Sequence, residues 1–253
     1  MRSGNPVLKD STFLDLSSGS VVAGDAGAMS LNGTVNKTGL LLLMTVLTAA
    51  YSWSQTMTPS GEVAPGAMVY LWGGAIGGLV LALVTAFKKE WSPVTAPLYA
   101  LVEGLFLGAI SAIYNAQFQG IVLQAVMLTF GIAFALLFAY RSGLIKATEN
   151  FKLGVAAATG GIALIYLATI GLGLFGIRIP YIHESGLIGI GFSLVVVVIA
   201  SLNLVLDFDF IENGVEAGAP KYMEWYAAFG LMVTLVWLYL ELLRLLSKLQ
   251  SRN

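Results

Sequence analysis

Residues 194–214 read LVVVVIASLNLVLDFDFIENG, an apolar run that ends in two aspartates, Asp207 and Asp209. The first six of these residues are all aliphatic, which is typical of a helix that lies in hydrocarbon. Both acidic residues come where the run stops. The stretch predicts a membrane-spanning helix, and it raises the question of what two carboxylates do at its end.

Composition extends this prediction to the whole chain of 253 residues. It is 57% hydrophobic and only 11% charged, whereas a soluble domain carries about 25% charged residues. Several apolar stretches are long enough to cross a hydrocarbon core about 30 Å thick. We therefore predict an all-α, polytopic integral membrane protein with seven transmembrane helices and the lipid bilayer as its surroundings.

The seven predicted spans differ in how they begin. Pro97 is expected to open the third span, because proline is tolerated in a first helical turn. Residues 1–35 are polar and lack a signal-peptide pattern, so they are expected to form a flexible cytoplasmic tail ahead of a transmembrane domain at 36–248. The spans are predicted at about 38–54, 68–87, 97–115, 120–140, 153–176, 186–208 and 222–246.

Several functional classes are excluded by composition. A net charge of −1 does not favour a nucleic-acid partner, and the lack of cysteine excludes disulfides and thiolate metal sites. The single histidine, His183, falls in a predicted loop, so neither an imidazole-rich metal site nor an intramembrane serine protease is expected. An intramembrane aspartyl protease needs aspartates on two helices. We therefore predict no enzymatic activity and no cofactor.

Lysine and arginine are distributed unequally between the two sides of the predicted membrane. The tail and the even-numbered loops carry nine of them and the opposite side carries four. Positive residues favour the cytoplasmic side, so the N-terminus is predicted in the cytoplasm and the C-terminus outside. The nine are Arg2, Lys9, Lys37, Lys88, Lys89, Arg141, Lys146, Lys152 and Lys221, and the four are Arg178, Arg244, Lys248 and Arg252.

The two aspartates of the sixth span point about 200° apart on a helix. Asn203 lies one turn before Asp207 and on the same face. One interpretation places Asn203 and Asp207 towards the other helices, with Asp209 towards headgroups and water. The alternative is that both aspartates only mark where the helix leaves the membrane.

Other polar residues within the spans also need an explanation. Glu103, the most deeply placed carboxyl, is either a proton- or cation-sensitive group or a protonated acid that bonds a neighbouring helix. Glu224 begins the seventh span, where the helix dipole favours an acidic residue. Glu241 and Arg244 lie one turn apart and predict an interfacial pair. Thr159, Gln124 and Thr234 predict helix–helix hydrogen bonds, and the pairs Gly73/Gly77, Gly74/Gly78 and Gly104/Gly108 predict close helix packing.

Three stretches resemble the Bax inhibitor-1 (YccA-like, TMBIM) family of membrane proteins. LVEGLFLGAIS (101–111) resembles its Glu-Gly-x-x-x-Gly region, and LDFDFI (206–211) resembles its Tyr-Asp-Thr-Gln-x-Ile motif. AAFGLMVTLVWLYLELLRLL (227–246) resembles its closing segment. The stretches MRSGNPVL (1–8) and GTVNKTGLLLL (33–43) resemble a bacterial branch, which implies a bacterial inner membrane.

This resemblance implies six helices around a central one and a pH-regulated leak of calcium or another cation. The family's sensor is a pair of aspartates, one from each of the last two spans. Asp207 occupies the first position, where it is also a candidate for a weak cation contact, but Thr234 occupies the second. Glu224 or Glu103 could substitute, Asp209 could do so after a local distortion, or this branch lacks the switch.

Two functions therefore remain open. The first is a pH-sensitive calcium or cation leak, or a proton-coupled transporter, with Asp207 and Glu103 along the path. The second is a non-transporting membrane factor that binds and modulates other membrane proteins or a membrane protease.

Overall fold

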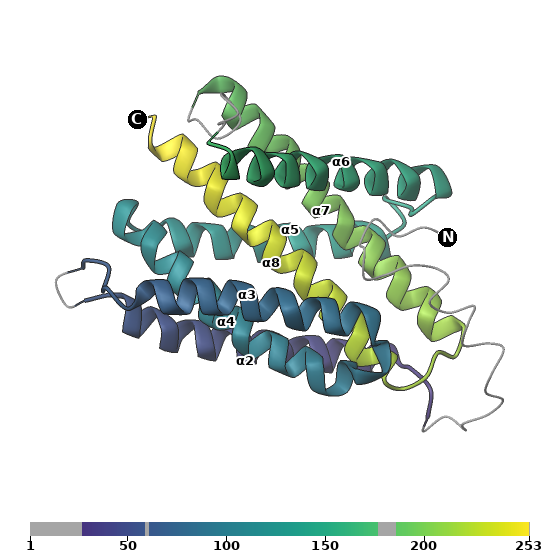
Figure 1. The fold of residues 1–253 in the computed structure, drawn as a ribbon. Coiled ribbons are helices and arrows are strands. Elements are labelled where there is room, and N and C mark those ends of the chain that lie inside the picture. The colour runs from purple at the N-terminus through teal and green to yellow at the C-terminus, as the bar shows by residue number, and fades with distance from the viewer. Residues whose placement is uncertain (1–26, 59–60, 177–185, 253) are drawn as a thin grey trace. The chain divides into compact units, whose positions relative to one another are not determined.

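The computed structural model describes residues 27–58, 61–176 and 186–252 (Figure 1). Seven of its helices are long and apolar enough to cross a membrane, which confirms the predicted all-α polytopic fold. The predicted tail up to residue 26 and the loop that holds His183 lie outside the described residues, and six helices around one stays a prediction. The seven are α2 (Leu31–Thr56), α3 (Ala67–Phe87), α4 (Ser92–Gln117), α5 (Ile121–Arg141), α6 (Glu149–Leu174), α7 (Leu187–Glu216) and α8 (Met223–Gln250).

The helices begin earlier or end later than the apolar runs that predicted them. Helix α2 begins at Leu31 because Ser30 caps it, with the Ser30 side chain accepting a hydrogen bond from the Gly33 N–H. Helix α7 continues to Glu216, so Asp207 and Asp209 lie inside a helix and not at its end. Hydropathy alone did not indicate these polar helical turns.

The prediction that Pro97 opens the third span is wrong. Helix α4 begins at Ser92, after the short 3-10 helix η2 (Lys89–Trp91), and Pro97 lies inside it. Pro93 is the proline of the first turn, where its missing N–H leaves no hydrogen bond unmade. Pro97 has no N–H to donate to the carbonyl of Pro93, and the helix continues through that gap.

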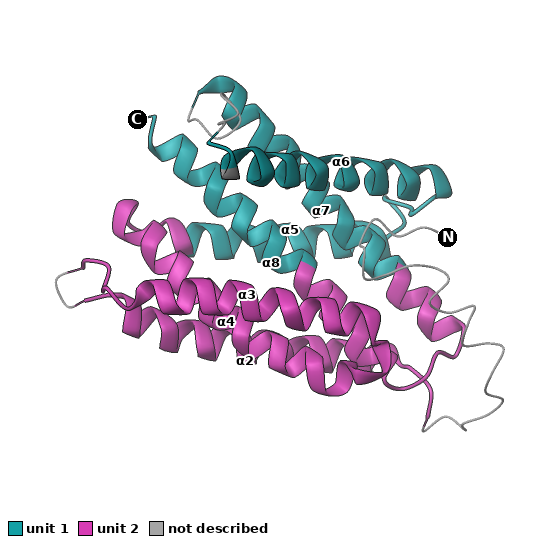
Figure 2. Ribbon diagram, viewed as in Figure 1, with its two compact units in different colours: residues 1–10, 123–209, 234–253 teal, residues 11–122, 210–233 magenta. Residues whose placement is uncertain are grey.

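The chain divides into two compact units (Figure 2). Among the described residues, unit 1 contains 123–176, 186–209 and 234–252, which supply nearly all of α5, α6, most of α7 and the later part of α8. Unit 2 contains residues 27–122 and Phe210–Val233, which supply α2, α3, α4, the end of α7 and the start of α8. Each unit is described separately.

Unit 2 is built by close backbone contact. A Cβ added to Gly104 of α4 would lie 1.9 Å from Thr48 Oγ1 and 2.5 Å from the Thr45 carbonyl oxygen on α2. A Cβ on Gly108 would lie 2.1 Å from the carbonyl oxygen of Ala49. Glycine at these two positions lets α2 and α4 touch, as the small-residue spacing predicts.

Glycines on α3 make a similar contact with α4, with one exception. A Cβ on Gly74 would lie 2.7 Å from the backbone nitrogen of Phe106, and one on Gly77 would lie 3.0 Å from Val102 Cγ1. Gly73 has open space around it. The packing prediction therefore holds for the other members of these pairs and not for Gly73.

Hydroxyl groups of α2 strengthen the same contact. Thr45 Oγ1 donates to the Ala100 carbonyl oxygen (3.1 Å), and Ser52 Oγ donates to that of Leu105 (2.7 Å). Such bonds satisfy polar groups inside an apolar segment.

In unit 1 the apolar side chains of two helices remain largely exposed. Phe134 and Phe138 of α5 and Leu164, Leu167 and Ile170 of α6 are all at least 65% exposed. A soluble protein rarely exposes so continuous an apolar surface, so we expect lipid to cover it.

Candidate functional site

Asp207 is completely buried in α7, and Asn203, one turn earlier, is 1% exposed. The Asn203 amide nitrogen donates to Thr159 Oγ1 on α6 and to the Ile199 carbonyl oxygen, both at 2.8 Å. The Asn203 carbonyl oxygen is buried and accepts no hydrogen bond from the described residues. Thr159 is therefore a helix–helix hydrogen-bonding residue, as its position predicts, and Asn203 retains one buried acceptor.

Asp209 faces Lys152, a cation expected from the sequence to lie in a loop. Lys152 lies in the first turn of α6, and its ammonium group is 2.7 Å from Asp209 Oδ2. The side chain of Lys152 is 6% exposed and that of Asp209 is 21% exposed. Glu149, at 3.5 Å from the same ammonium group, is exposed. Asp209 is thus mostly enclosed by an ion pair between α6 and α7, and it is not simply turned to headgroups and water.

Glu103 lies near the middle of α4 and is 8% exposed. Its carboxyl group packs on α3, where a Cβ added to Gly78 would lie 2.4 Å from Glu103 Oε2. Tyr99 is the titratable neighbour one turn back. No hydrogen bond or ion pair joins Glu103 to another described residue, so the expected bond to a neighbouring helix is not present there. An unpaired buried carboxyl group is costly when charged.

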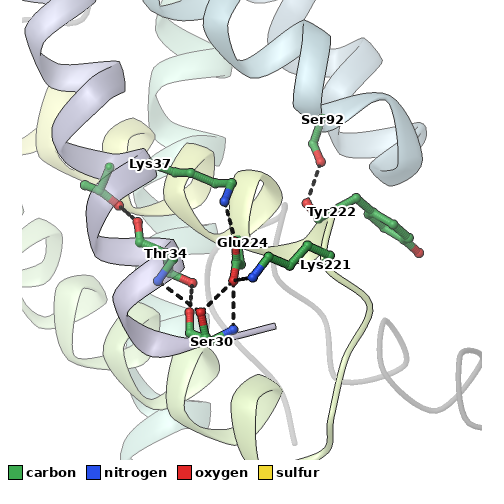
Figure 3. A network of polar contacts seen from close by, with 9 residues as sticks. Ser30, Thr34, Lys37, Ser92, Lys221, Tyr222 and Glu224 are labelled. Atoms are coloured by element: carbon green, nitrogen blue, oxygen red, sulfur yellow. Dashed lines mark hydrogen bonds and ion pairs between the residues drawn. The ribbon is translucent and has the colours of Figure 1, made fainter. Parts of the chain in front are cut away.

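Glu224 has an environment that the helix dipole alone did not predict (Figure 3). Its side chain is completely buried and accepts hydrogen bonds from the Ser30 N–H (2.9 Å) and hydroxyl (2.8 Å). Lys37 donates to Oε2, and the ammonium group of Lys221 lies 3.0 Å from Oε1. Four donors therefore satisfy this carboxylate, which joins the start of α2 to the start of α8.

Hydrogen bonds in the same region also hold the segments that lead into α2 and α8. The Met29 N–H donates to the Ala219 carbonyl oxygen at 2.6 Å. Ser92 Oγ donates to the Tyr222 carbonyl oxygen at 3.0 Å (Figure 3). A Cβ on Gly33 would lie 2.1 Å from Glu224 Oε1, so only glycine leaves room for the carboxylate. Glu224 belongs to unit 2 and is neutralised by two lysines, which does not favour it as the second sensor carboxylate.

The predicted Glu241–Arg244 pair is confirmed and is part of a larger cluster. Arg244 Nη1 donates to both oxygens of Glu241 at 3.0 Å and to the Tyr166 hydroxyl at 2.6 Å. Tyr166, on α6, donates in turn to Glu241 Oε1 at 2.9 Å, and Trp237 Nε1 lies 3.3 Å from the same oxygen. The pair lies within α8, where Glu241 is 2% exposed, and the bonds of Tyr166 make the cluster a contact between α6 and α8.

Two further polar residues of α8 are buried. Thr234, which the sequence resemblance aligns with the family's second aspartate, is 3% exposed and belongs to the same unit as Asp207. Lys248 is 5% exposed, and its ammonium group donates to the Ser193 hydroxyl (2.9 Å) and the Gly189 carbonyl oxygen (3.0 Å) of α7. Gln124 lies 3.3 Å from the amide nitrogen of Gln250, which meets its prediction as a helix–helix contact.

Sequence reasoning missed Lys152 and Tyr166 as members of this polar set. The two residues and Thr159 are spaced seven apart, which puts them on one face of α6. This regular spacing in an otherwise apolar helix is the signal that could have found them. The described residues hold no group of three acidic, histidine or cysteine side chains that could bind a metal ion, so a cation contact at Asp207 would have few protein ligands.

Comparison with known proteins places the chain in a family. Neither the curated proteins nor the solved structures gave a match. The model of the family described as Bax inhibitor 1 like matches residues 5–251, nearly the whole chain, and covers all seven long helices. With its seven spans and its buried Asp207, the chain belongs to the Bax inhibitor 1-like family of membrane proteins.

Proposed function

We propose that this chain is a pH-sensitive leak pathway or transporter for calcium or another cation, controlled by the carboxyl group of Asp207. The observation that carries the proposal is the complete burial of Asp207 inside α7, one turn after the buried Asn203. An ionisable side chain inside an apolar segment is costly and marks ion or proton paths. Carboxylate and amide oxygens are ligands that Ca²⁺ accepts.

The sensing group in this proposal is one carboxyl and not a pair. Thr234 stands where the resemblance places a second aspartate, and a threonine cannot share a proton. Asp209 is an unsuitable substitute because Lys152 already pairs with it, and the same holds for Glu224 with its two lysines. Glu103 is a separate protonatable group within unit 2.

The proposed location is a bacterial inner membrane with the N-terminus in the cytoplasm and the C-terminus outside. The support is the uneven distribution of lysine and arginine, nine against four. In this orientation Lys152 and Lys221 lie towards the cytoplasm and Arg244 and Lys248 lie towards the outside. The proposed activity is transport, without catalysis or a resident cofactor.

The alternative function is a non-transporting membrane factor that binds other membrane proteins or a membrane protease. The substitution of Thr234 for the second carboxylate is the observation that favours it, because a branch without the paired sensor has less reason to conduct. The large exposed apolar surface of α5 and α6 would accept another membrane helix as readily as lipid.

Calcium flux into proteoliposomes between pH 6 and pH 8 tests the proposal. We expect wild-type protein to leak above empty liposomes with a rate that changes with pH, and we expect Asp207→Asn to remove that pH dependence. Glu216→Gln is the control, because its carboxyl group is exposed at the end of the same helix. Equal leaks from wild type and Asp207→Asn at every pH would reject the carboxylate control, and no flux above empty liposomes would favour the alternative.

Restoring the missing carboxylate gives a second test. Two interacting carboxyl groups titrate together, so Thr234→Asp is expected to make the pH dependence of the leak steeper than the one-proton profile of the wild type. Thr234→Asn adds a side chain of the same size without a charge and should leave the steepness unchanged. Equal steepness in all three proteins would show that position 234 does not take part in sensing.

A further inference from the structure

Helix α6 carries three polar residues on one face, and each of them bonds a different helix or helix region of unit 1. Lys152, Thr159 and Tyr166 are spaced by seven residues, which returns to almost the same face of an α-helix. At 1.5 Å per residue they cover about 21 Å along the axis, a large part of a hydrocarbon core about 30 Å thick. We call these three residues the α6 ladder.

The residues between the ladder positions show that this face is turned inward. Val155 and Ile162 are 4% and 7% exposed. Leu164 and Leu167 on the other side of α6 are 68% and 65% exposed. The ladder therefore lies against α7 and α8 of its own unit and away from the surface that we expect lipid to cover.

An ion pair closes the Lys152 end of the ladder. The Lys152 ammonium group and the Asp209 carboxylate are 2.7 Å apart, and both side chains are mostly enclosed. A hydroxyl or amide pair would be enough to pack two helices. A charged pair at this position is costly to desolvate, but it can separate when water or an ion replaces one partner.

A buried acceptor without a donor marks the middle of the ladder. Thr159 Oγ1 accepts a hydrogen bond from the Asn203 amide nitrogen at 2.8 Å. Asn203 is 99% buried, yet its carbonyl oxygen accepts no hydrogen bond from the described residues. Buried polar atoms are nearly always satisfied by protein or by water, so this oxygen points to a bound water molecule or cation beside Thr159.

A second charged cluster closes the Tyr166 end. The Tyr166 hydroxyl donates to Glu241 at 2.9 Å and accepts from Arg244 at 2.6 Å, which joins α6 to α8. Lys248 holds the start of α7 to the same helix through Ser193. Both ends of the ladder are thus closed by charged side chains, whereas its middle is neutral and hydrogen-bonded.

We infer that the α6 ladder lines a water-accessible path through unit 1, with the Lys152–Asp209 pair and the Tyr166–Glu241–Arg244 cluster as its two gates. The ligand of its middle is water or a hydrated cation, bound by Asn203 and Thr159. The inference rests on the proposed transport function for what passes along the path. The existence of the path depends only on whether water reaches Thr159, whatever the protein transports.

The lack of native cysteine makes a direct test possible. Thr159→Cys and Leu164→Cys each give a protein with one thiol, the first on the ladder and the second on the exposed face of α6. Both are placed in proteoliposomes and exposed to a positively charged, membrane-impermeant methanethiosulfonate reagent. We expect the thiol at 159 to react faster than the thiol at 164, because the latter faces lipid and does not form a thiolate there.

Opening the gates should accelerate the reaction at 159. In the Thr159→Cys background, Lys152→Ala is expected to raise the labelling rate by roughly fivefold, the factor that corresponds to about 1 kcal/mol of gate stability. Tyr166→Phe should raise it when reagent is added on the opposite side. Asn203→Cys, which approaches the same point from α7, replaces Thr159→Cys if that protein does not fold.

Three outcomes separate this inference from the proposed function. Labelling at 159 and 203 no faster than at 164, even with a gate removed and with calcium flux present, would place the path elsewhere and leave the transport function standing. Fast labelling without flux would support the water path and reject transport. Neither labelling nor flux would reject both, and the ladder would then be helix packing alone.

Discussion

In unit 2, α4 meets α2 backbone to backbone, whereas in unit 1, α6 meets α7 and α8 through polar side chains. Gly104 and Gly108 bring α4 onto α2 so closely that a methyl group has no room. In unit 1, Lys152, Thr159 and Tyr166 of α6 each reach a polar partner on α7 or α8. One chain of apolar helices therefore uses two ways to join helices inside a membrane.

The two kinds of contact differ in the free energy needed to move the helices apart. Close backbone contact depends on dispersion over many atoms and is lost as a whole when the helices move apart. A hydrogen bond or ion pair can exchange its partner for water, so a helix can move at smaller cost. We therefore expect unit 2 to be the rigid part of the molecule and unit 1 to be the part that opens.

The largest effect is expected from filling a backbone contact of unit 2. Gly104→Ala places a methyl group within 2 Å of Thr48 Oγ1 and close to the Thr45 carbonyl oxygen. Over-packing of this kind costs about 3 kcal/mol in the free energy of unfolding. Thermal unfolding in detergent measures it, with Gly160→Ala in α6 as the control, because a Cβ there meets nothing within 4 Å.

The control should be neutral or stabilising, since alanine is favoured over glycine in a helix by about 1 kcal/mol. If Gly104→Ala unfolds at the wild-type temperature, backbone contact is not what holds unit 2 together. If Gly160→Ala is as unstable as Gly104→Ala, the difference between the two units disappears.

The next largest effect compares two buried carboxyl groups of unit 2. Glu224→Gln removes a charge that neutralises Lys37 and Lys221 and also weakens the bonds from Ser30. Because both lysines are partly exposed, we expect a loss of about 2 kcal/mol in unfolding free energy, below the usual cost of breaking a buried pair. Glu103→Gln removes no pair among the described residues, so its loss should stay below about 1 kcal/mol.

Urea or detergent-titrated unfolding of the two variants side by side measures this difference. Equal losses would mean that the Glu224 network adds nothing to unit 2. A larger loss from Glu103→Gln would mean that the Glu103 carboxyl group, which packs on Gly78, stabilises unit 2 more than the four donors around Glu224 do.

The sequence predicted the spans well because hydropathy is a property of whole segments. It failed at their ends, where α7 continues through Asp207 and Asp209 to Glu216 and α4 begins before Pro97. Caps and hydrogen bonds decide helix ends, and both depend on neighbours such as Tyr222 and Ser30, which are distant in sequence or outside the apolar run.

The candidate site was only half predictable for a related reason. The helical period placed Asn203 and Asp207 on one face, and both are buried. The partners came from other helices, so neither the Lys152–Asp209 pair nor the two lysines on Glu224 could be read from spacing along one segment. Lys152 in particular falls in a predicted loop, because a charge is not expected inside a span.

A smaller effect is expected at the Lys152 end of the α6 ladder. Lys152→Ala removes the partner of Asp209, and we expect a loss of about 1 kcal/mol, since the Asp209 side chain is partly exposed. The change should be local, with faster amide hydrogen exchange in the first turns of α6 and around residue 209 of α7. Lys146→Ala is the control, because Lys146 is exposed and forms no ion pair with the described residues.

Equal exchange in the two lysine variants would mean that the pair does not hold α6 to α7. Faster exchange throughout both units would mean that it supports the whole fold, and the contrast between a rigid and an opening unit would be wrong.

The smallest effect on stability is expected at the other end, and it separates a gate from a simple packing contact. Tyr166→Phe removes one hydroxyl, but Arg244 still bonds both oxygens of Glu241 directly, so the loss should be about 0.5 kcal/mol. Tyr114→Phe in unit 2, whose hydroxyl bonds no described residue, should cost less still. If the hydroxyl only packs helices, water access to Thr159 changes as little as stability does. If it closes a path, access from that side rises although stability hardly changes, because a gate depends on the few atoms that block the opening and stability depends on the whole unit.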